Sequence, residues 1–426
     1  MSTPRLRLIR PAPDPLGLYI RVGHADQPTL LSFITSGDAA LSGVVIDARR
    51  VLKQNELMSQ ALDHKLDVVL DPQTLAMGTP HGYRKTMDGL PWSAKRPHEH
   101  DDFKSSTQRR AISRAIAEFS VRHQFTQVMA PTHVLTGPDD PWLRSDVEST
   151  HELREALREL GAGNIEIIYS LALPYESFRT AAKRATILDK LDEVDADAIW
   201  LNVTGCGADG SATRITRYAD AAADFQTLGK AIVADHVGGL VGLAFLAFGA
   251  VGGIAHGVTL GERFDTSNWY KPSFGTPFAQ HTRVYFPTLD WHLQRVDAEK
   301  FFESSARAKA HFGCTDSHCC PRGIMGMLQH PGRHFLYQRT REVGGLSQIP
   351  ESLRRQRFLE EHVRLASDRA LLATKLNLPE ALAAKAVSQS ARLDKMRIEL
   401  AEYVRRHRDA TFARHPVTRA AREARG

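Results

Sequence analysis

Short apolar segments alternate with amphipathic stretches through most of this 426-residue chain, and this alternation restricts its possible folds more than any other feature. Runs rich in Val, Ile and Leu predict strands at residues 17–23, 43–47, 67–71, 126–131, 165–170, 198–203, 231–235 and 252–256. Helical signals lie between most of them; residues 145–163 carry Leu153, Leu157 and Leu160 on one face and end in glycines. Eight such strand-helix units predict an α/β protein with a (β/α)8, or TIM, barrel.

The predicted barrel covers residues 1–275, and two further parts follow it. Residues 276–370 form a predicted lobe rich in cysteine and histidine, and residues 371–426 form a predicted basic helical tail. The connection after the third strand, residues 72–105, mixes prolines, glycines, aromatics and charges without a period. We expect a functional loop or lid over the barrel mouth there, with a disordered insertion as the alternative.

Arginine is concentrated near the C-terminus, at RRQR (354–357) and in the tail that ends TRAAREARG, and the net charge of the chain is +6. Clustered arginines bind phosphate backbones, so nucleic acid, either tRNA or DNA, is an expected partner. A solvated basic helix face is the alternative.

Composition argues against several other classes of protein. The longest apolar run, residues 238–255, is interrupted by glycines, so no membrane span is expected. The N-terminus lacks the apolar segment of an export signal, and four cysteines are too few for a disulfide framework in a chain of this size. We therefore expect a soluble, cytoplasmic protein, for which a homodimer is a possible assembly.

Polar residues occur at nearly every predicted strand end. In a TIM barrel the carboxyl ends of the strands surround the active site, so these residues are predicted to share one rim. The predicted rim consists of His24, Asp47, Asp71, His133, Ser170, Asn202, Asp235, His236 and His256. The candidate catalytic residues among them are Asp47, Asp71, His133, Asp235 and His256, and the candidate substrate-binding residues are His24, Asn202 and His236. The alternatives are helix caps or turns for the aspartates and core positions for the histidines.

Glycines follow the seventh and eighth predicted strands, in the segment 235–257. Bare backbone amides at these positions bind phosphate in many barrels, which makes Gly238 and Gly239 candidate substrate-binding residues. The alternative is that the glycines only allow a helix to pack closely on the strands.

The stretch HFGCTDSHCCPRG, residues 311–323, holds three of the four cysteines. Thiolates and imidazoles at this density predict a structural zinc site, with a further ligand from His330, His334 or His362. Adjacent side chains usually point in different directions, so only one residue of the pair at 319 and 320 is an easy ligand beside Cys314. A buried thiol cluster and a redox pair are the alternatives. The candidate metal ligands are Cys314, His318, Cys319, Cys320 and His334.

A barrel followed by a cysteine cluster, a histidine-bearing helix and a basic C-terminal region resembles the tRNA-guanine transglycosylase superfamily, including its DNA-modifying branch. Members exchange a guanine in nucleic acid for a 7-deazapurine, using an aspartate nucleophile, a second aspartate and a structural zinc. Asp71 follows the third strand as the family's key aspartate does, although Pro-Gln-Thr replaces the family's Ser-Gly-Gly. Asp265, in GERFDTSNW, matches a Phe-Asp pair after the family's last strand. The resemblance implies catalytic roles for Asp71 and Asp265, and a base flipped out of its stack.

Two readings from other classes compete with base exchange. A barrel enzyme for a phosphorylated small molecule or flavin would use the glycines of segment 235–257 for phosphate and the rim for acid/base chemistry. A non-catalytic barrel that serves as a scaffold within a complex would use the cysteine-rich lobe for docking. The first predicts a phosphate-bearing or absorbing ligand, and the second predicts that rim substitutions leave function intact.

Overall fold

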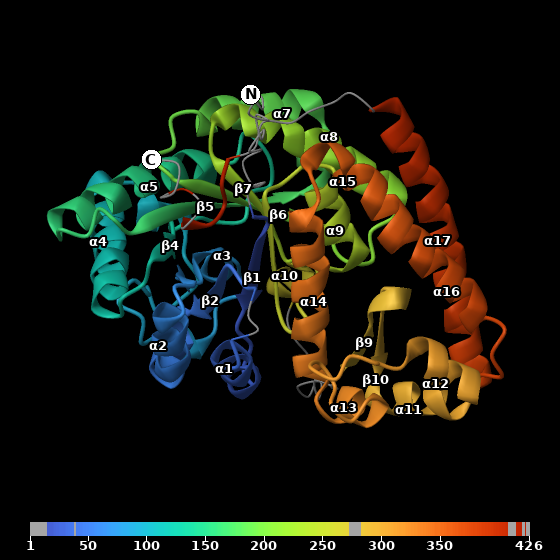
Figure 1. The fold of residues 1–426 in the computed structure, drawn as a ribbon. Coiled ribbons are helices and arrows are strands. Elements are labelled where there is room, and N and C mark those ends of the chain that lie inside the picture. The colour runs from blue at the N-terminus through green and yellow to red at the C-terminus, as the bar shows by residue number, and fades with distance from the viewer. Residues whose placement is uncertain (1–14, 38–39, 272–282, 408–414, 420–421, 423–426) are drawn as a thin grey trace, which may run out of the picture.

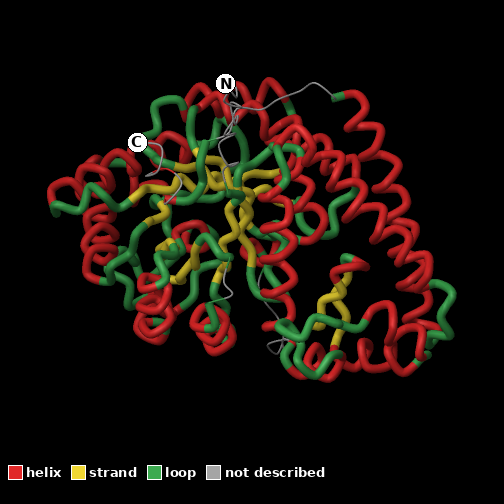
Figure 2. Tube along the Cα trace, viewed as in Figure 1, coloured by secondary structure: helices red, strands yellow, loops and turns green. Residues whose placement is uncertain are grey.

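The computed structural model describes residues 15–37, 40–271, 283–407, 415–419 and 422. Eight parallel strands pair in sequence order and close into a barrel, which confirms the predicted fold (Figures 1 and 2). The strands are β1 (Gly17–Arg21), β2 (Gly43–Asp47), β3 (Asp67–Asp71), β4 (Gln127–Met129), β5 (Glu166–Pro174), β6 (Ala198–Thr204), β7 (Ala231–Asp235) and β8 (Gly253–His256). Each lies at its predicted place.

Alternation along each strand decides which side chains enter the barrel. The inner cluster contains Tyr19, Val45, Val69, Met129, Ile168, Ala198, Trp200, Ala231, Val233, Ala255 and Val417. Successive residues of a strand face opposite sides, so the residue two positions after an inner one also faces inward. Arg21, Asp47, Asp71 and Asp235 stand at such positions, and they form a charged layer above the apolar one.

Helices surround the barrel in the usual way for this fold, with apolar faces toward the strands. They are α1 (Gln27–Thr35), α2 (Asn55–Asp63), α4 (Ser106–Arg122), α5 (Pro141–Glu159), α6 (Tyr175–Arg179), α7 (Ala181–Leu191), α8 (Ala212–Phe225) and α9 (Gly239–Ala247), with short 3-10 turns at Ala48–Lys53 and Gln226–Leu228. All nine residues of α9 are buried. Its apolar sequence therefore reflects burial inside the protein and not a membrane span.

The insertion after β3, residues 72–105, is folded and contains short helical segments. It contains α3 (Thr74–Met77) and 3-10 turns at Lys85–Met87 and His100–Phe103. Trp92 is buried and its indole Nε1 donates to the carbonyl of Pro72 at 3.0 Å. The amide of His81 donates to the carbonyl of Trp269, which follows β8 (α10, Ser267–Tyr270), at 2.7 Å. The insertion thus reaches from the end of β3 to the segment after β8, as expected for a loop at the barrel mouth.

The C-terminal part lies beside the barrel, and helix α14 stands between the two (Figure 1). It begins with a hairpin of β9 (Arg283–Phe286) and β10 (Trp291–Gln294), separated by a 3-10 turn at Pro287–Leu289. The helices are α11 (Arg295–Glu303), α12 (Ala306–Phe312), α13 (Ile324–Gln329), α14 (Pro331–Gln348), α15 (Glu351–Phe358), a π-helical stretch at Leu359–Arg364, α16 (Leu365–Ala373) and α17 (Glu380–Arg406). Among the described residues, no helix is long and apolar enough to cross a membrane.

Candidate functional site

A cavity of about 340 Å³ lies at the carboxyl ends of the barrel strands. It is lined by Arg21, Val22, Gly23, His24, Ala25, Asp26, Val45, Asp47, Arg50, Asp71, Gln73, His236, Gly257, Val258, Leu260 and Gly261. Of the predicted rim, the structure therefore brings His24, Asp47, Asp71 and His236 together around one cavity. This cavity, which we call the mouth cavity, is the candidate active site.

A guanidinium crosses the floor of the mouth cavity and joins two carboxylates. Arg21 on β1 donates from Nη1 to Asp71 Oδ2 at 2.6 Å and from Nε to Asp235 Oδ1 at 2.7 Å. Asp235 is completely buried, whereas the side chains of Arg21 and Asp71 are each 15% exposed. Burial alone would raise the pKa of Asp235, but the positive charge of Arg21 overcomes it and holds that pKa below its ordinary value. Asp235 is therefore ionised at neutral pH and supports Arg21 from below.

Asp71 is the carboxylate of this group that meets the cavity. Besides the Arg21 bond, its Oδ1 accepts the backbone amide of Gln73 at 2.8 Å. Two donors on different oxygens fix the orientation of the carboxyl group, and both are donors that a carboxylate accepts. Gln73 itself has a φ of 66°, in the left-handed region that non-glycine residues seldom adopt. The turn after β3 thus presents a fixed carboxylate to the cavity.

Asp47 both lines the cavity and caps the turn that follows β2. It is paired with Asp71 in the β2–β3 register. Its Oδ1 accepts the amide of Arg49 at 2.9 Å and Nε of the same residue at 3.0 Å. The capping role foreseen as the alternative for Asp47 is therefore real, and it coexists with a place in the cavity wall.

His236 follows β7 and also lines the cavity. Its φ of 57° places it in the left-handed region, where a histidine is uncommon and where strain often marks functional sites. Burial lowers the pKa of its imidazole, which the negative charge of Asp235 only partly offsets. A neutral imidazole in the cavity wall can accept a proton and so act as a general base.

Several predicted rim residues lie elsewhere. Asn202 and Ser170 are buried, and Asn202 Nδ2 donates to Ser170 Oγ at 2.9 Å. His256 is fully buried, contacts Phe335 of α14, and pairs its Nδ1 with the carbonyl of Gly257 at 2.9 Å. Neither Asn202 nor His256 is among the lining residues of the mouth cavity.

His133 belongs to a buried cluster that anchors the insertion. Its Nδ1 lies 2.7 Å from Asp146 Oδ1, and its ring stacks on Trp142 with centroids 3.6 Å apart. Its Nε2 lies 3.4 Å from Nδ1 of His98, a residue of the insertion. Burial lowers the pKa of His133 to about 3, so the ring is neutral. The position predicted as catalytic is thus a core histidine that contacts the insertion.

Asp265 is an exposed carboxylate two residues before the first residue of α10. Its Oδ1 accepts the amide of Ser267 at 2.9 Å, and this backbone bond lowers its pKa. It is not one of the residues around the mouth cavity. The structure therefore separates the two aspartates that the family resemblance assigned to catalysis.

The glycines after β7 do not offer free amides to a phosphate. The amide of Gly239 donates to Glu262 Oε1 at 3.2 Å, and the amide of Leu240 donates to Asp290 Oδ1 at 2.9 Å. A Cβ at Gly238 would stand 1.8 Å from Glu262 Oε1, so the glycine admits this carboxylate. The amides of Gly239 and Leu240 thus bond to carboxylates of the protein itself, and the predicted anion site at Gly238 and Gly239 stays a prediction.

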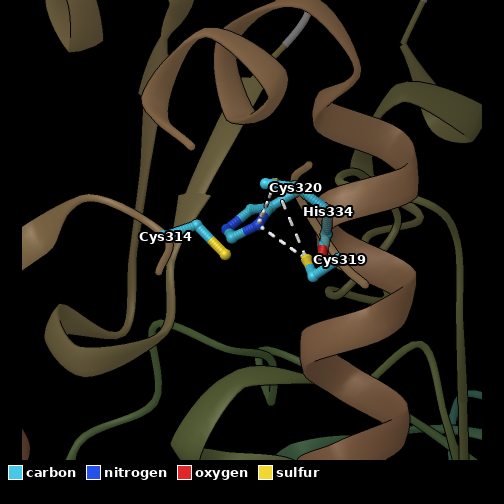
Figure 3. A group of neighbouring side chains, drawn as sticks. All are labelled: Cys314, Cys319, Cys320 and His334. Atoms are coloured by element: carbon cyan, nitrogen blue, oxygen red, sulfur yellow. Dashed lines mark hydrogen bonds between the residues drawn. The ribbon is translucent and has the colours of Figure 1, made fainter. Parts of the chain in front are cut away.

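Three cysteines and one histidine form a second cluster, shown in Figure 3. The ligand atoms of Cys314, Cys319, Cys320 and His334 all lie within 4.8 Å of one another, and the cluster can hold a metal ion. Cys319 Sγ lies 3.7 Å from Cys320 Sγ and 3.3 Å from His334 Nδ1. His318 is exposed and lies outside this group.

The expectation that only one of the two adjacent cysteines can serve as a ligand is wrong. They lie in a turn, in which Cys320 donates its amide to the carbonyl of Asp316 at 2.7 Å, and the alternation of a strand does not apply. His334 Nε2 lies 3.0 Å from the carbonyl of Tyr285 on β9. A proton on Nε2 would be donated to this carbonyl and would leave Nδ1 free as a ligand, an arrangement typical of metal-binding histidines.

Of the predicted basic region, residues 408–414, 420–421 and 423–426 lie outside the described residues. In the described part, the arginines named next bond to other groups of the protein. In RRQR, Arg354 is buried and its Nε donates to the carbonyl of Leu346, and Arg355 donates to the carbonyl of His407 at 2.7 Å. Arg357 pairs with Glu361. On α17, acidic partners also face Arg392, Arg397, Arg405 and Arg406. These arginines support the lobe or stand in surface ion pairs.

Sequence reasoning missed Arg21 and Gln73. Arg21 lies within GLYIRVG, which reads as a buried strand, and a lone arginine two positions after the inward-facing Tyr19 was the available signal. Gln73 acts through its backbone, for which the sequence carries no signal.

No family model and no curated protein matches the chain. Among solved structures, an endo-1,4-beta-xylanase of Penicillium canescens matches with 9% identity and a TM-score of 0.36, over 56% of this chain and 81% of its own. A putative phosphonomutase of Burkholderia cenocepacia has 15% identity and a TM-score of 0.33, over 58% and 88%. A GH18 chitinase of Pseudoalteromonas aurantia has 10% identity and a TM-score of 0.35, over 56% and 92%. At these values the fold rests on the strand pairing of the chain itself.

Proposed function

We propose that the protein is an enzyme that transfers a glycosyl group at the mouth cavity, with Asp71 as the nucleophile. The observation that carries this proposal is the fixed carboxylate of Asp71, held by Arg21 and by the amide of Gln73 at the cavity wall. A carboxylate that attacks an anomeric carbon gives a covalent intermediate and divides one difficult displacement into two easier ones.

The remaining groups of the cavity have roles that fit this chemistry. The departing guanine leaves as its N9 anion and takes up a proton from the solvent. His236, which burial keeps neutral, removes the N9 proton of the incoming base when that base attacks the glycosyl intermediate, and then loses this proton to the solvent. Asp47, on the neighbouring strand, places a second negative charge near the positive charge that develops on the sugar. Arg21 touches Asp71 and acts by positioning it.

We further propose guanine in nucleic acid as the group that is exchanged, as the family resemblance implies. A base exchange needs no water and leaves the sugar-phosphate backbone intact, and it requires a flipped base to reach the cavity from outside. The long insertion beside the cavity would contact the flanking nucleotides. For the phosphate-binding alternative, the amides of Gly239 and Leu240 are engaged by Glu262 and Asp290, which favours base exchange.

We propose zinc as the metal of the Cys314 cluster, in a structural role. Tetrahedral zinc with bonds of about 2.3 Å to sulfur and about 2.0 Å to nitrogen separates its ligand atoms by about 3.5–3.8 Å. The separation of 3.7 Å between the sulfurs of Cys319 and Cys320 and that of 3.4 Å between Cys320 Sγ and His334 Nδ1 suit this geometry. Four protein ligands leave no open position, so the metal would hold the lobe together and take no part in the reaction.

Exchange of radiolabelled guanine into tRNA and duplex DNA tests the proposed function. The matched variants are Asp71→Asn and Asp265→Asn, because both remove one aspartate charge but only Asp71 lines the mouth cavity. We expect the first to lose at least about 1,000-fold in rate and the second to stay within about threefold of wild type. Equal losses in both variants, or exchange that persists in Asp71→Asn, would overturn the assignment.

A further inference from the structure

The C-terminal segment re-enters the barrel at the end opposite to the mouth. Val417 is 3% exposed and belongs to the inner apolar cluster with Tyr19 and Trp200. It comes from the last, red part of the chain in Figure 1, which lies near β5 and apart from α17. This end of the barrel is thus closed by a residue that is almost 400 positions from β1, since Tyr19 Oη donates to the carbonyl of Val417 at 3.3 Å with a separation of 398 residues.

Three glycines make the notch that receives Val417. A Cβ at Gly252 would stand 2.5 Å from Val417 Cγ2, and one at Gly17 would stand 2.8 Å from Val417 Cγ1. A Cβ at Gly253 would also lie 3.0 Å from Cγ1. Any larger residue at the first two positions would occupy the volume of the valine side chain. The starts of β1 and β8 are therefore shaped to hold one β-branched residue.

An arginine five residues later fastens the segment to β5. Arg422 Nε donates to Glu166 Oε1 at 2.9 Å, and its Nη2 pairs with Glu166 Oε2. Gln127 Nε2 donates to the same Glu166 Oε2 at 2.8 Å. Arg422 Nη1 also donates to the carbonyl of Pro416 at 3.0 Å, which folds the segment back on itself. A guanidinium bound to two oxygens of one carboxylate selects arginine over lysine.

The segment also contacts a side-chain hydrogen bond inside the barrel, between Tyr19 and Asp67, which we call the Tyr19–Asp67 rung. Tyr19 Oη donates to Asp67 Oδ2 at 2.8 Å, and this bond joins β1 to β3 across β2. The same two strands carry Arg21 and Asp71 at the mouth. The acidic groups Asp67 and Glu166 face the basic groups of the segment. The glycine notch therefore matches the segment in shape, and the carboxylates match it in charge.

We propose that this end of the barrel is a peptide-binding socket, and that residues 415–419 together with Arg422 are its ligand, bound in cis. The socket recognises a segment in which a β-branched apolar residue is followed five positions later by an arginine that a helical bond, from the amide of Arg422 to the carbonyl of Thr418 at 3.1 Å, turns back toward it. The occupant is the chain's own tail. Binding closes the barrel at its base and holds the Tyr19–Asp67 rung beneath the mouth cavity.

The test uses the full-length chain with a tail that cannot dock, Val417→Asp/Arg422→Ala, and a fluorescent peptide of residues 415–426, HPVTRAAREARG. Fluorescence anisotropy should show saturable binding of the peptide to the variant, and at least about tenfold weaker binding of the same peptide with both changes. Wild type, whose socket is filled, should bind neither peptide. Absence of binding to a variant that retains a cooperative melt would overturn the proposal, and so would equal binding to wild type.

A second measurement decides the matter if that variant does not fold. Val417→Cys is a small apolar change, and Val387→Cys is its matched control, because Val387 is 58% exposed on α17. Thiol labelling read by peptide mass spectrometry should be at least about 100-fold slower at position 417 than at 387. Adding Glu166→Gln should speed labelling at 417 alone. Equal rates at the two positions would refute docking, and a dimer by gel filtration that dissociates with Arg422→Ala would assign the segment to a second copy.

Discussion

At the residue scale, the charge balance inside the barrel depends on the guanidinium of Arg21. Asp235 is fully buried, and Arg21 is the positive charge that keeps it ionised. Arg21→Met should therefore lower the free energy of unfolding by about 3–5 kcal/mol at pH 7.5, because it leaves a buried carboxylate without its partner.

Urea unfolding at two pH values checks this prediction. Without Arg21, burial should raise the pKa of Asp235 above that in the unfolded chain, so the variant should recover stability as the pH falls toward 5. Arg114→Met, which removes an arginine from exposed pairs with Glu118 and Glu159, is the control and should cost less than about 1 kcal/mol. A variant of Arg21 as stable as this control would contradict the role given to the cation.

In the wild-type protein, Asp67 gives a pH dependence of the same sign as the one expected for Asp235 in Arg21→Met. Burial raises its pKa from 3.8 to about 6, against the smaller effect of the Tyr19 hydroxyl that donates to it. The folded chain then binds this proton more tightly than the unfolded chain. Its stabilising contribution is complete below pH 3.8 and is lost as the pH rises through about 6.

The substitution Asp67→Asn removes the loss of stability that ionisation of Asp67 causes at neutral pH. The variant should be more stable than wild type at pH 7.5, by up to about 3 kcal/mol. The difference should shrink to about 1 kcal/mol at pH 4.5 and vanish below about pH 3.8. Thermal or urea unfolding of both proteins over this range measures it. A variant that is less stable than wild type at pH 7.5 would show that the carboxylate is needed in its charged form.

At the element scale, α9 and α14 are joined through a buried carboxylate. Glu262 accepts the amide of Gly239 at the start of α9 and pairs at 2.9 Å with Arg339 of α14, a fully buried arginine. Burial opposes ionisation of Glu262, but Arg339 prevails and the pKa of this carboxyl lies well below its ordinary value.

Glu262→Gln should lower the free energy of unfolding by about 3–5 kcal/mol, because Arg339 stays buried with less negative charge around it. Glu361→Gln is the matched control, since Glu361 forms an exposed pair with Arg357 and should cost less than about 1 kcal/mol. Chemical denaturation of the two variants makes the comparison. Suppose instead that Glu262→Gln keeps its stability and binds inorganic phosphate beside Arg339. The Glu262 carboxylate would then only occupy an anion site, and its role in joining the two helices would be contradicted.

The elements themselves were predictable from the sequence, whereas the contacts between them were not. Buried parallel strands read as continuous apolar runs, so all eight were found at their places. Local spacing could not show that Glu262 and Asp290 would fill the amides at α9, because both come from later in the chain. The rule of alternating side chains failed at Cys319 and Cys320 because they lie in a turn. His133 and His256 were placed at the rim from strand ends alone, and the structure buries both away from the mouth cavity.

At the scale of the whole molecule, the cysteine cluster links the turn before α13 to α14 and, through Tyr285, to β9. Purified protein should contain one zinc per chain. Cys314→Ser should lose it, because one of four ligands is gone, and Cys206→Ser should keep it, because Cys206 is buried in the barrel part and outside the cluster.

Plasma emission spectrometry gives the metal content, and chelation followed by melting gives its effect on the fold. Removal of zinc should lower the melting temperature of wild type and leave that of metal-free Cys314→Ser unchanged. If wild type contains no metal after purification in zinc-containing buffer, the zinc proposal is wrong and the cluster is a set of buried thiols.

Attack by Asp71 on a sugar carbon would leave a covalent adduct, which mass spectrometry of a quenched reaction detects. Protein mixed with guanine-containing nucleic acid, in the absence of an incoming base, is quenched with acid, treated with nuclease and digested. We expect a glycosyl adduct on the peptide that contains Asp71, absent from Asp71→Asn and present in Asp265→Asn. An adduct on any other residue, or exchange of base that proceeds with no adduct at all in a rapid-quench series, would contradict it.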